Sequence, residues 1–140
     1  MSAKGIVNKY LEAWNDRDFD RMRGLMHPDY TYTGGDGKEQ KGPEAGLAVS
    51  QTFARAFPDG RINVVNIKEF GDTVLVEFIG RGTHRGDLMG IAPTGRSVSL
   101  PVCEVFELRD GKIHREREYR DMATIMTQLG VTRVPSAALA

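Results

Sequence analysis

Several features are missing from this sequence, and each absence excludes a class of protein. The 140 residues contain one cysteine, Cys103, so no disulfide can form within the chain, which fits a reducing compartment. The 19 lysines and arginines are balanced by 19 acidic residues, and no basic cluster is present that would bind nucleic acid or an anionic membrane. No run approaches the ~20 apolar residues that span a bilayer. We therefore expect a cytoplasmic protein with neither nucleic acid nor a membrane as a partner.

Motifs for cofactors, metals and covalent catalysis are also missing. The segment 90–97 resembles a phosphate-binding loop, but it has Arg96 where that motif needs lysine, and strand-like alternation follows it instead of a helix. The histidines His27, His84 and His114 have no ligand partners at the spacing of a metal site. No Gly-x-Ser-x-Gly motif for a nucleophilic serine occurs. The sequence therefore predicts no cofactor and no metal.

The hydrophobic period changes along the chain. Helical spacing predicts helices at about 6–14, 19–26 and 43–57, and again at 122–129 after a capping Asp121. Alternation predicts strands at 61–70, 73–82, 97–109 and 112–120. Helices followed by a meander are typical of an α+β domain in which a curved antiparallel sheet wraps as a cone around the N-terminal helices and encloses a pocket. We predict a single domain over residues 1–130 and a C-terminal tail over 131–140.

One carboxylate interrupts an apolar strand face. Every second residue of the predicted strand 97–109 is apolar except Glu104, and the apolar members of that face are Val98, Leu100, Val102, Phe106 and Leu108. Burial of an unpaired carboxylate costs several kcal/mol or raises its pKa until the group is neutral. The residues opposite Glu104 on the next strand therefore decide what it can do.

The turn at Asp110-Gly111 allows two registers for that next strand. A two-residue turn places Glu104 opposite Arg117, which predicts a cross-strand ion pair. A three-residue loop places Glu104 opposite Glu116 with Glu118 on the same face, so that two or three carboxylates line the pocket. Crowded carboxylates raise one another's pKa, which is how a proton-transfer group is prepared for use near neutral pH. The residues themselves leave both registers open.

A family resemblance bears on this choice. The chain resembles the SnoaL-like polyketide cyclases of the nuclear-transport-factor-2-like superfamily in several short motifs that follow one another along nearly its full length. They are Trp14-Asn15, His27-Pro28-Asp29-Tyr30, Gly42-Pro43-Glu44, the segments 82–90 and 93–96, Asp110-Gly111-Lys112-Ile113 and Gln128-Leu129-Gly130. The resemblance implies the same α+β cone, and it favours a register in which Glu104 and Glu118 face one pocket.

The resemblance also implies a reaction and a site. The characterised cyclases close the last ring of an aromatic polyketide ester by an intramolecular aldol condensation without a cofactor. Their acid/base aspartate falls at Glu118 and their assisting histidine at Glu104, so this chain has glutamate at both positions. A tyrosine or phenylalanine of the family pocket becomes Trp14, and a pocket asparagine becomes Tyr32. His84 lies in the signature loop of the family.

Two functions remain open on these grounds. In the first, Glu118 removes a proton α to a carbonyl of a small apolar ligand, while Glu104 or His84 stabilises the enolate oxygen. The expected ligand contacts are Trp14, Tyr32, Val102, Phe106 and Asp121, although Asp121 is also a suitable helix cap. In the second, a non-catalytic module binds a small ligand or forms a homodimer through the open sheet face, and Arg117 and Arg115 neutralise Glu104 and Glu118. In either case we expect a homodimer or a higher homo-oligomer.

Overall fold

The computed structural model of the protein describes residues 1–132, so all but the first two positions of the predicted tail lie outside the described residues. The helices are α1 (Ala3–Asn15), α2 (Phe19–Gly24), α3 (Pro43–Ala56) and α4 (Met122–Leu129). The strands are β1 (Met26–Thr33), β2 (Glu39–Lys41), β3 (Arg61–Phe70), β4 (Thr73–Thr83), β5 (Ser97–Arg109) and β6 (Lys112–Arg120). None of these helices has the length and apolar content needed to cross a lipid bilayer.

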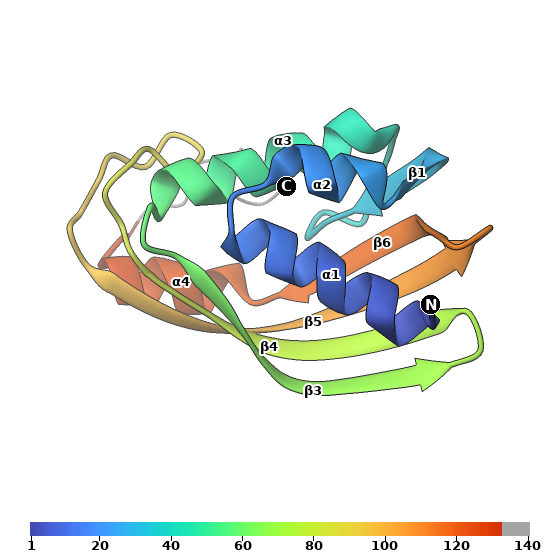
Figure 1. Ribbon diagram of the computed structural model, residues 1–140. Coiled ribbons are helices and arrows are strands. Elements are labelled where there is room, and N and C mark those ends of the chain that lie inside the picture. The colour runs from blue at the N-terminus through green and yellow to red at the C-terminus, as the bar shows by residue number, and fades with distance from the viewer. Residues whose placement is uncertain (133–140) are drawn as a thin grey trace.

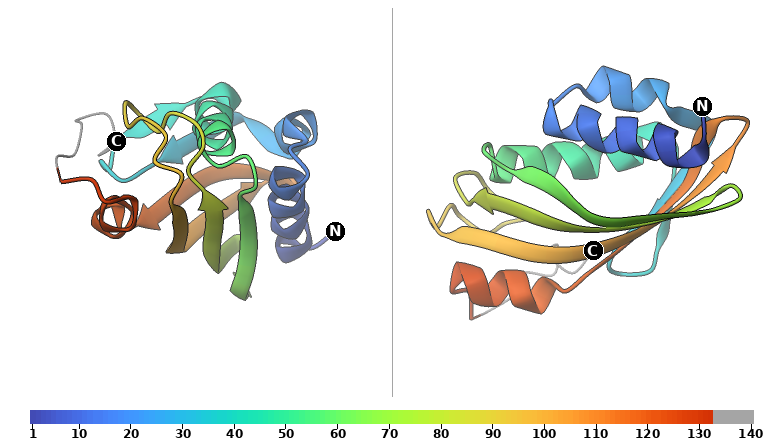
Figure 2. Two further views of the ribbon diagram at one scale, coloured as in Figure 1. Left: turned by 90° about the vertical axis from the view of Figure 1, so that its left-hand side faces the viewer. Right: turned by 60° about the horizontal axis from the view of Figure 1, so that its bottom comes forward.

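All six strands form one curved sheet in the order β2-β1-β6-β5-β4-β3 (Figure 1). Helices α1, α2 and α3 lie over the concave face, and α4 packs beside β5 beyond the end of β6 (Figure 2). The Gln128 side chain of α4 accepts a hydrogen bond from the Ser99 backbone N–H and donates one to the Ser99 carbonyl oxygen. These backbone groups of β5 lie beyond the residues that pair with β6. The predicted α+β cone is confirmed, and the core lies between the inner face of the sheet and α1 to α3, with further buried residues from α4.

Two local predictions differ from the structure. The second helix ends at Gly24 instead of reaching Met26, because Met26–Thr33 pairs with β6 as strand β1. That pairing is parallel, whereas we expected an antiparallel sheet throughout. The helix therefore ends before Pro28, which lies within β1, and the free edge of β6 supplies hydrogen-bond partners that local propensity does not reveal.

The hairpin between β5 and β6 combines a two-residue turn with a β-bulge. Asp110 and Gly111 both have positive φ (53° and 71°), as a type I′ turn requires, and this turn places Arg109 opposite Lys112. The register then shifts by one residue, leaving His114 without a partner on β5. Beyond the bulge Glu104 therefore lies opposite Glu118, in neither of the two registers that the turn alone predicted.

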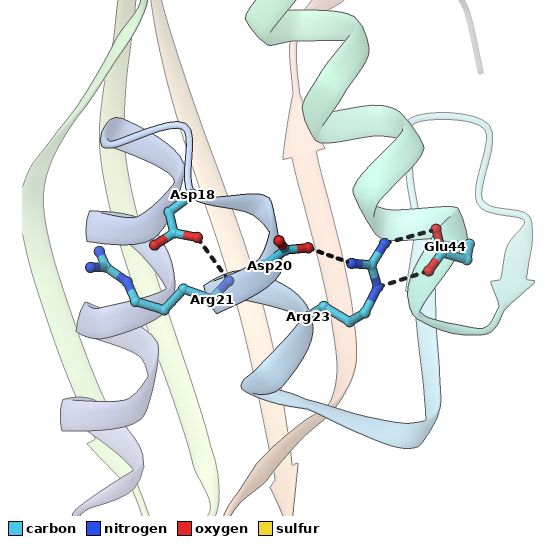
Figure 3. Close-up of polar contacts among 5 residues, drawn as sticks. All are labelled: Asp18, Asp20, Arg21, Arg23 and Glu44. Atoms are coloured by element: carbon cyan, nitrogen blue, oxygen red, sulfur yellow. Dashed lines mark hydrogen bonds and ion pairs between the residues drawn. The ribbon is translucent and has the colours of Figure 1, made fainter.

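Polar contacts hold the short helix α2 in place against its neighbours. The Asp18 carboxylate accepts a hydrogen bond from the Arg21 backbone N–H and caps α2. Arg23 forms ion pairs with Asp20 of the same helix and with Glu44 in the first turn of α3 (Figure 3). The two nitrogens that contact Glu44 give a fork-like pair that joins α2 to α3 at the surface.

Helix α3 approaches the sheet closely at Gly46. A Cβ added at this position would lie 2.7 Å from Cζ of Tyr30, whose ring is fully buried on β1. Any larger residue would displace that ring, and Tyr30 donates a hydrogen bond to Glu116 in the core. The glycine therefore allows the helix to cover the sheet without moving the buried polar groups.

Gly46→Ala is expected to lower the free energy of unfolding by about 1–3 kcal/mol, because the new methyl group overlaps the buried Tyr30 ring. Gly24→Ala is the matched control, since no atom lies within 4 Å of its added Cβ and alanine favours helix by up to about 1 kcal/mol. Urea denaturation of both variants measures the difference. Equal stability of the two variants would contradict the close packing of α3 on β1.

Candidate active site

A cavity of about 110 Å³ lies between the concave face of the sheet and the helices α1 and α3. Its walls are mostly apolar and aromatic and include Leu11, Trp14, Phe53, Phe57, Phe78, Leu100 and Val102. Polar side chains also contribute, namely Tyr10, Tyr32, Glu104, Glu116, Glu118 and Arg120. An apolar cavity with a few converging polar groups is the usual form of a small-molecule site.

The polar groups come from alternating positions of adjacent strands. On β6, Glu116, Glu118 and Arg120 alternate and line the cavity, and Glu104 reaches it from the opposite position on β5. Carboxylate oxygens of the three glutamates lie within 4.8 Å of one another. Such proximity in an apolar cavity cannot be maintained with three negative charges unless other groups compensate.

Arg120 compensates the charge of Glu118. Its Nη1 lies 2.6 Å from Oε1 of Glu118, and the guanidinium side chain is only 2% exposed. The same Nη1 donates to the Tyr32 hydroxyl at 3.1 Å, and the guanidinium carbon lies 5.1 Å from the centre of the Phe53 ring. Burial alone would lower the pKa of Arg120, but the charge of Glu118 and the Tyr32 contact outweigh it and raise that pKa. The contact is a charge-assisted ion pair inside the cavity.

Two tyrosines satisfy Glu116. The hydroxyls of Tyr10 and Tyr30 both donate to Oε1 of Glu116, at 2.8 and 2.7 Å. Burial, followed by the negative charge of Glu116, raises the pKa of both tyrosines, which stay neutral donors. Glu116 is 6% exposed, and its Oε1 atom accepts both of these hydrogen bonds.

Glu104 is in the opposite situation. It is 4% exposed, and within the described residues its Oε2 atom has no hydrogen-bond partner. Burial raises its pKa well above the usual range, and the negative charges of Glu116 and Glu118 raise it further. Glu104 is therefore the carboxyl group of the cluster that keeps its proton at neutral pH.

The cluster also contains the oxygen donors that a hard metal ion would need. Divalent cations such as Mg²⁺ and Ca²⁺ bind carboxylate oxygens, and only these three glutamates bring their oxygens together in the described part of the chain. However, Arg120 already contacts Glu118, and two tyrosine hydroxyls already occupy Oε1 of Glu116. This set of contacts suits the sharing of protons better than the binding of a cation.

Five of the eight residues predicted for the site line the cavity. Trp14, Tyr32, Val102, Glu104 and Glu118 all contribute to its walls, and the expectation that both glutamates face one pocket is confirmed. The ion pair predicted for the first register does not form. Glu104 lies opposite Glu118, and Arg117 pairs with Glu107 across the same two strands.

His84, predicted to donate to a ligand, does not line the cavity. It is fully buried in the loop after β4, where its Nδ1 accepts the backbone N–H of Thr94 at 3.2 Å. Its imidazole lies against the ring of Phe57, with 5.6 Å between ring centres. Burial lowers the pKa of His84, so the ring is neutral and belongs to the packing of this loop.

Two further predicted contacts lie outside the cavity. Phe106 is fully buried, packs edge-on against Tyr10 with ring centres 5.9 Å apart, and supports the site from behind. Asp121 caps α4 through the backbone N–H of Ala123 and the hydroxyl of Thr124, which is the alternative that its position in the sequence allowed. Neither residue is among those that line the cavity.

The sequence does not identify Tyr10 or Tyr30 as members of the site, and it offers Arg120 only as a possible ion-pair partner of Glu118, which is the pair that forms. Arg120 shares the strand parity of Glu116 and Glu118, so the alternation of β6 carried a signal for it. Tyr10 belongs to the apolar stripe of α1, and its spacing is that of an ordinary core residue. Its role as a donor depends on a contact with Glu116 across 106 positions of sequence.

Comparisons with known proteins show the family to which this chain belongs. Aklanonic acid methyl ester cyclase AcmA of Streptomyces galilaeus is 32% identical over 129 residues, covering 89% of this chain and 88% of that protein. Nogalonic acid methyl ester cyclase of Streptomyces nogalater is 30% identical, covering 86% of this chain and 91% of that protein. The crystal structure of IdmH from Streptomyces antibioticus superposes with a TM-score of 0.82 at 30% identity, covering 94% of this chain and 100% of that one. The family model for SnoaL-like polyketide cyclases matches residues 4–129, and the chain belongs to this family.

Proposed function

We propose that this protein is a cyclase that uses two carboxyl groups and no cofactor to close a ring in a small carbonyl compound. The observation that carries the proposal is the contrast between two facing glutamates. Glu118 is paired with a buried guanidinium and Glu104 has no basic partner within the described residues. Environments that push two neighbouring acids toward opposite protonation states identify one as a base and the other as an acid.

The aldol step then follows from these two groups. The Glu118 carboxylate removes a proton from the carbon α to a carbonyl, and the resulting enolate carbon attacks a second carbonyl carbon of the same molecule. A carbon–carbon bond forms, the C=O π electrons move to oxygen, and that oxygen takes the proton of Glu104 to become a hydroxyl group. Glu118 is left protonated and Glu104 ionised. Because the two carboxyls are neighbours, one proton passed from Glu118 to Glu104 restores the starting state.

The names of the relatives indicate the substrate class. AcmA and the Streptomyces nogalater protein are named as cyclases of aklanonic and nogalonic acid methyl esters, which supports a polycyclic ester as the substrate here. The aromatic walls formed by Trp14, Phe53 and Phe57 suit a flat ring system. Simple keto–enol isomerisation uses the same two groups and is the related alternative. A homo-oligomeric state, a cytoplasmic location and the absence of a cofactor stay predictions.

A non-catalytic binding module is the competing function. That interpretation requires both acids to be neutralised by arginines, as expected from Arg115 and Arg117. Among residues 1–132, only Glu118 has such a partner, and it is Arg120. A buried acid left unpaired destabilises a simple binding module without any benefit, whereas a proton donor requires it.

Glu118→Gln tests the base. With aklanonic or nogalonic acid methyl ester as substrate, the variant is expected to lower kcat by about a hundredfold to ten-thousandfold, because the amide cannot accept the α proton. Glu118→Asp, which restores the family residue, should keep more activity than the amide. Glu107→Gln is the matched control, since this glutamate of β5 lies outside the cavity and pairs with Arg117. Product formation and α-proton exchange into D₂O are measured, and full activity of Glu118→Gln would refute the assignment.

Glu104→Gln tests the acid through stability. Because the pKa of Glu104 is higher in the folded than in the unfolded state, the folded protein binds an extra proton between the two values. The contribution of Glu104 to the wild-type free energy of unfolding should therefore fall as pH rises above about 4.5, toward the folded-state pKa. Removing this titration makes the variant gain stability relative to wild type as pH rises, which urea denaturation at several pH values measures.

Glu107→Gln should show the opposite sign. Its hydrogen bond to Arg117 lowers the pKa of Glu107, so the stability that this carboxylate contributes is present above its unfolded pKa and is lost as pH falls. This variant is expected to be less stable than wild type at neutral pH and to converge with it in acid. If Glu104→Gln instead tracks the wild type at every pH, Glu104 does not hold a raised pKa and cannot be the acid.

A further inference from the structure

The hydroxyl of Tyr32 has a proton that the described residues do not use. A phenol has one O–H donor and can also accept hydrogen bonds on its oxygen. The oxygen of Tyr32 accepts from Nη1 of Arg120 at 3.1 Å, and no acceptor for its proton is recorded among residues 1–132. Tyr32 is 3% exposed and lines the cavity. The proton is therefore available to a molecule bound there.

Arg120 makes this hydroxyl a stronger donor. A cation that donates to the phenol oxygen polarises the O–H bond, and hydrogen bonds in such a chain strengthen one another in a low-dielectric site. Burial and the negative charge of Glu118 raise the pKa of Tyr32, so the group keeps its proton. Tyr32 can donate a hydrogen bond, but it is not a base.

The strand order places this donor on the other side of Glu118 from Glu104. Tyr32 lies on β1, paired with Glu116 of β6, while Glu104 lies on β5 opposite Glu118. Because β6 lies between β1 and β5, the cavity has a neutral donor on each side of the base. Fixed hydrogen-bond donors on both sides can stabilise a carbonyl oxygen as it becomes negative, while the base removes the proton from the α carbon.

We propose that Tyr32 is a second catalytic hydrogen-bond donor to the substrate oxygen that gains negative charge, and that Arg120 is its positioning residue. This inference rests on the proposed function, because it concerns the enolate that Glu118 produces. Nη1 of Arg120 donates hydrogen bonds to both Glu118 and Tyr32, so this one nitrogen positions the base and the hydrogen-bond donor together. The site should accordingly prefer ligands whose oxygen carries negative charge over neutral ligands of the same shape.

Naphthol binding tests this preference without any turnover. The probes are 2-naphthol, its more acidic 6-cyano derivative and naphthalene, which has the same ring system without the oxygen. Fluorescence titration measures affinity, and the absorption spectrum of bound naphthol reports the fraction that is ionised. The wild type is expected to bind 6-cyano-2-naphthol most tightly, to hold it largely as naphtholate with the naphthol proton transferred to Glu118, and to bind naphthalene weakly.

Tyr32→Phe removes only the hydroxyl. It should weaken 6-cyano-2-naphthol binding roughly tenfold to a hundredfold, the usual effect of one hydrogen bond to a charged group, and lower the ionised fraction. Naphthalene affinity should not change, because the ring of residue 32 remains. Tyr119→Phe is the matched control, since this tyrosine is 58% exposed and does not line the cavity.

Arg120→Lys and Arg120→Met separate positioning from packing. Lysine keeps a positive donor and should retain part of the naphtholate preference, whereas methionine should lose it to the extent that Tyr32→Phe does. Thermal unfolding followed by circular dichroism confirms that each variant is folded. A merely structural role for Arg120 would change the affinities for naphthol and naphthalene equally and would overturn the positioning assignment.

The outcomes separate this proposal from the cyclase assignment. Unchanged naphtholate binding in Tyr32→Phe, or a wild type that binds naphthol no better than naphthalene, overturns the donor role whatever the turnover data show. Full turnover in Glu118→Gln overturns the cyclase mechanism even if naphtholate binding depends on Tyr32. Loss of naphtholate binding in Tyr32→Phe with naphthalene binding intact supports the donor.

Discussion

The one-residue bulge between β5 and β6 is the constraint on which the site depends. It converts the register of a two-residue turn into one that places Glu104 opposite Glu118. Because side chains alternate between the faces of a strand, a slip of one residue would turn Glu116, Glu118 and Arg120 away from the cavity. The position of His114, which has no partner on β5, therefore decides whether the protein has an acidic pocket or an ordinary charged strand.

In that register, the three glutamates of the cavity differ in the side chains that contact them. Arg120 stabilises the charge of Glu118, and Tyr10 and Tyr30 donate to Glu116. Within the described residues, Glu104 has neither an arginine nor a tyrosine as a partner. Burial and the charges of the two other glutamates raise its pKa and favour its neutral form. Three chemically identical side chains thus acquire different roles from positions that differ by only a few ångströms.

The same arrangement accounts for the departure from the family at Glu104. A histidine at the corresponding position of the characterised cyclases can donate a hydrogen bond, and a protonated glutamate can do so as well. Keeping glutamate protonated requires burial and acidic neighbours, and both are present here. Replacement of aspartate by Glu118 keeps a carboxylate, and Arg120 holds the longer side chain in place. Under the proposed function, the substitutions therefore preserve an acid and a base.

The sequence by itself determined the α+β class, most helix and strand bounds, the cap at Asp121 and an acid placed on an apolar face, because periodicity and capping are local. It also placed Glu104 and Glu118 together, through family resemblance. Only the tertiary structure decided the bulge, the parallel pairing of β1 and the recruitment of Tyr10, Tyr30 and Arg120, and it removed His84 from the cavity. These features arise from contacts between segments that are distant in the sequence. The hydrogen bond from Tyr10 to Glu116 spans 106 positions, so no local sequence pattern predicts it.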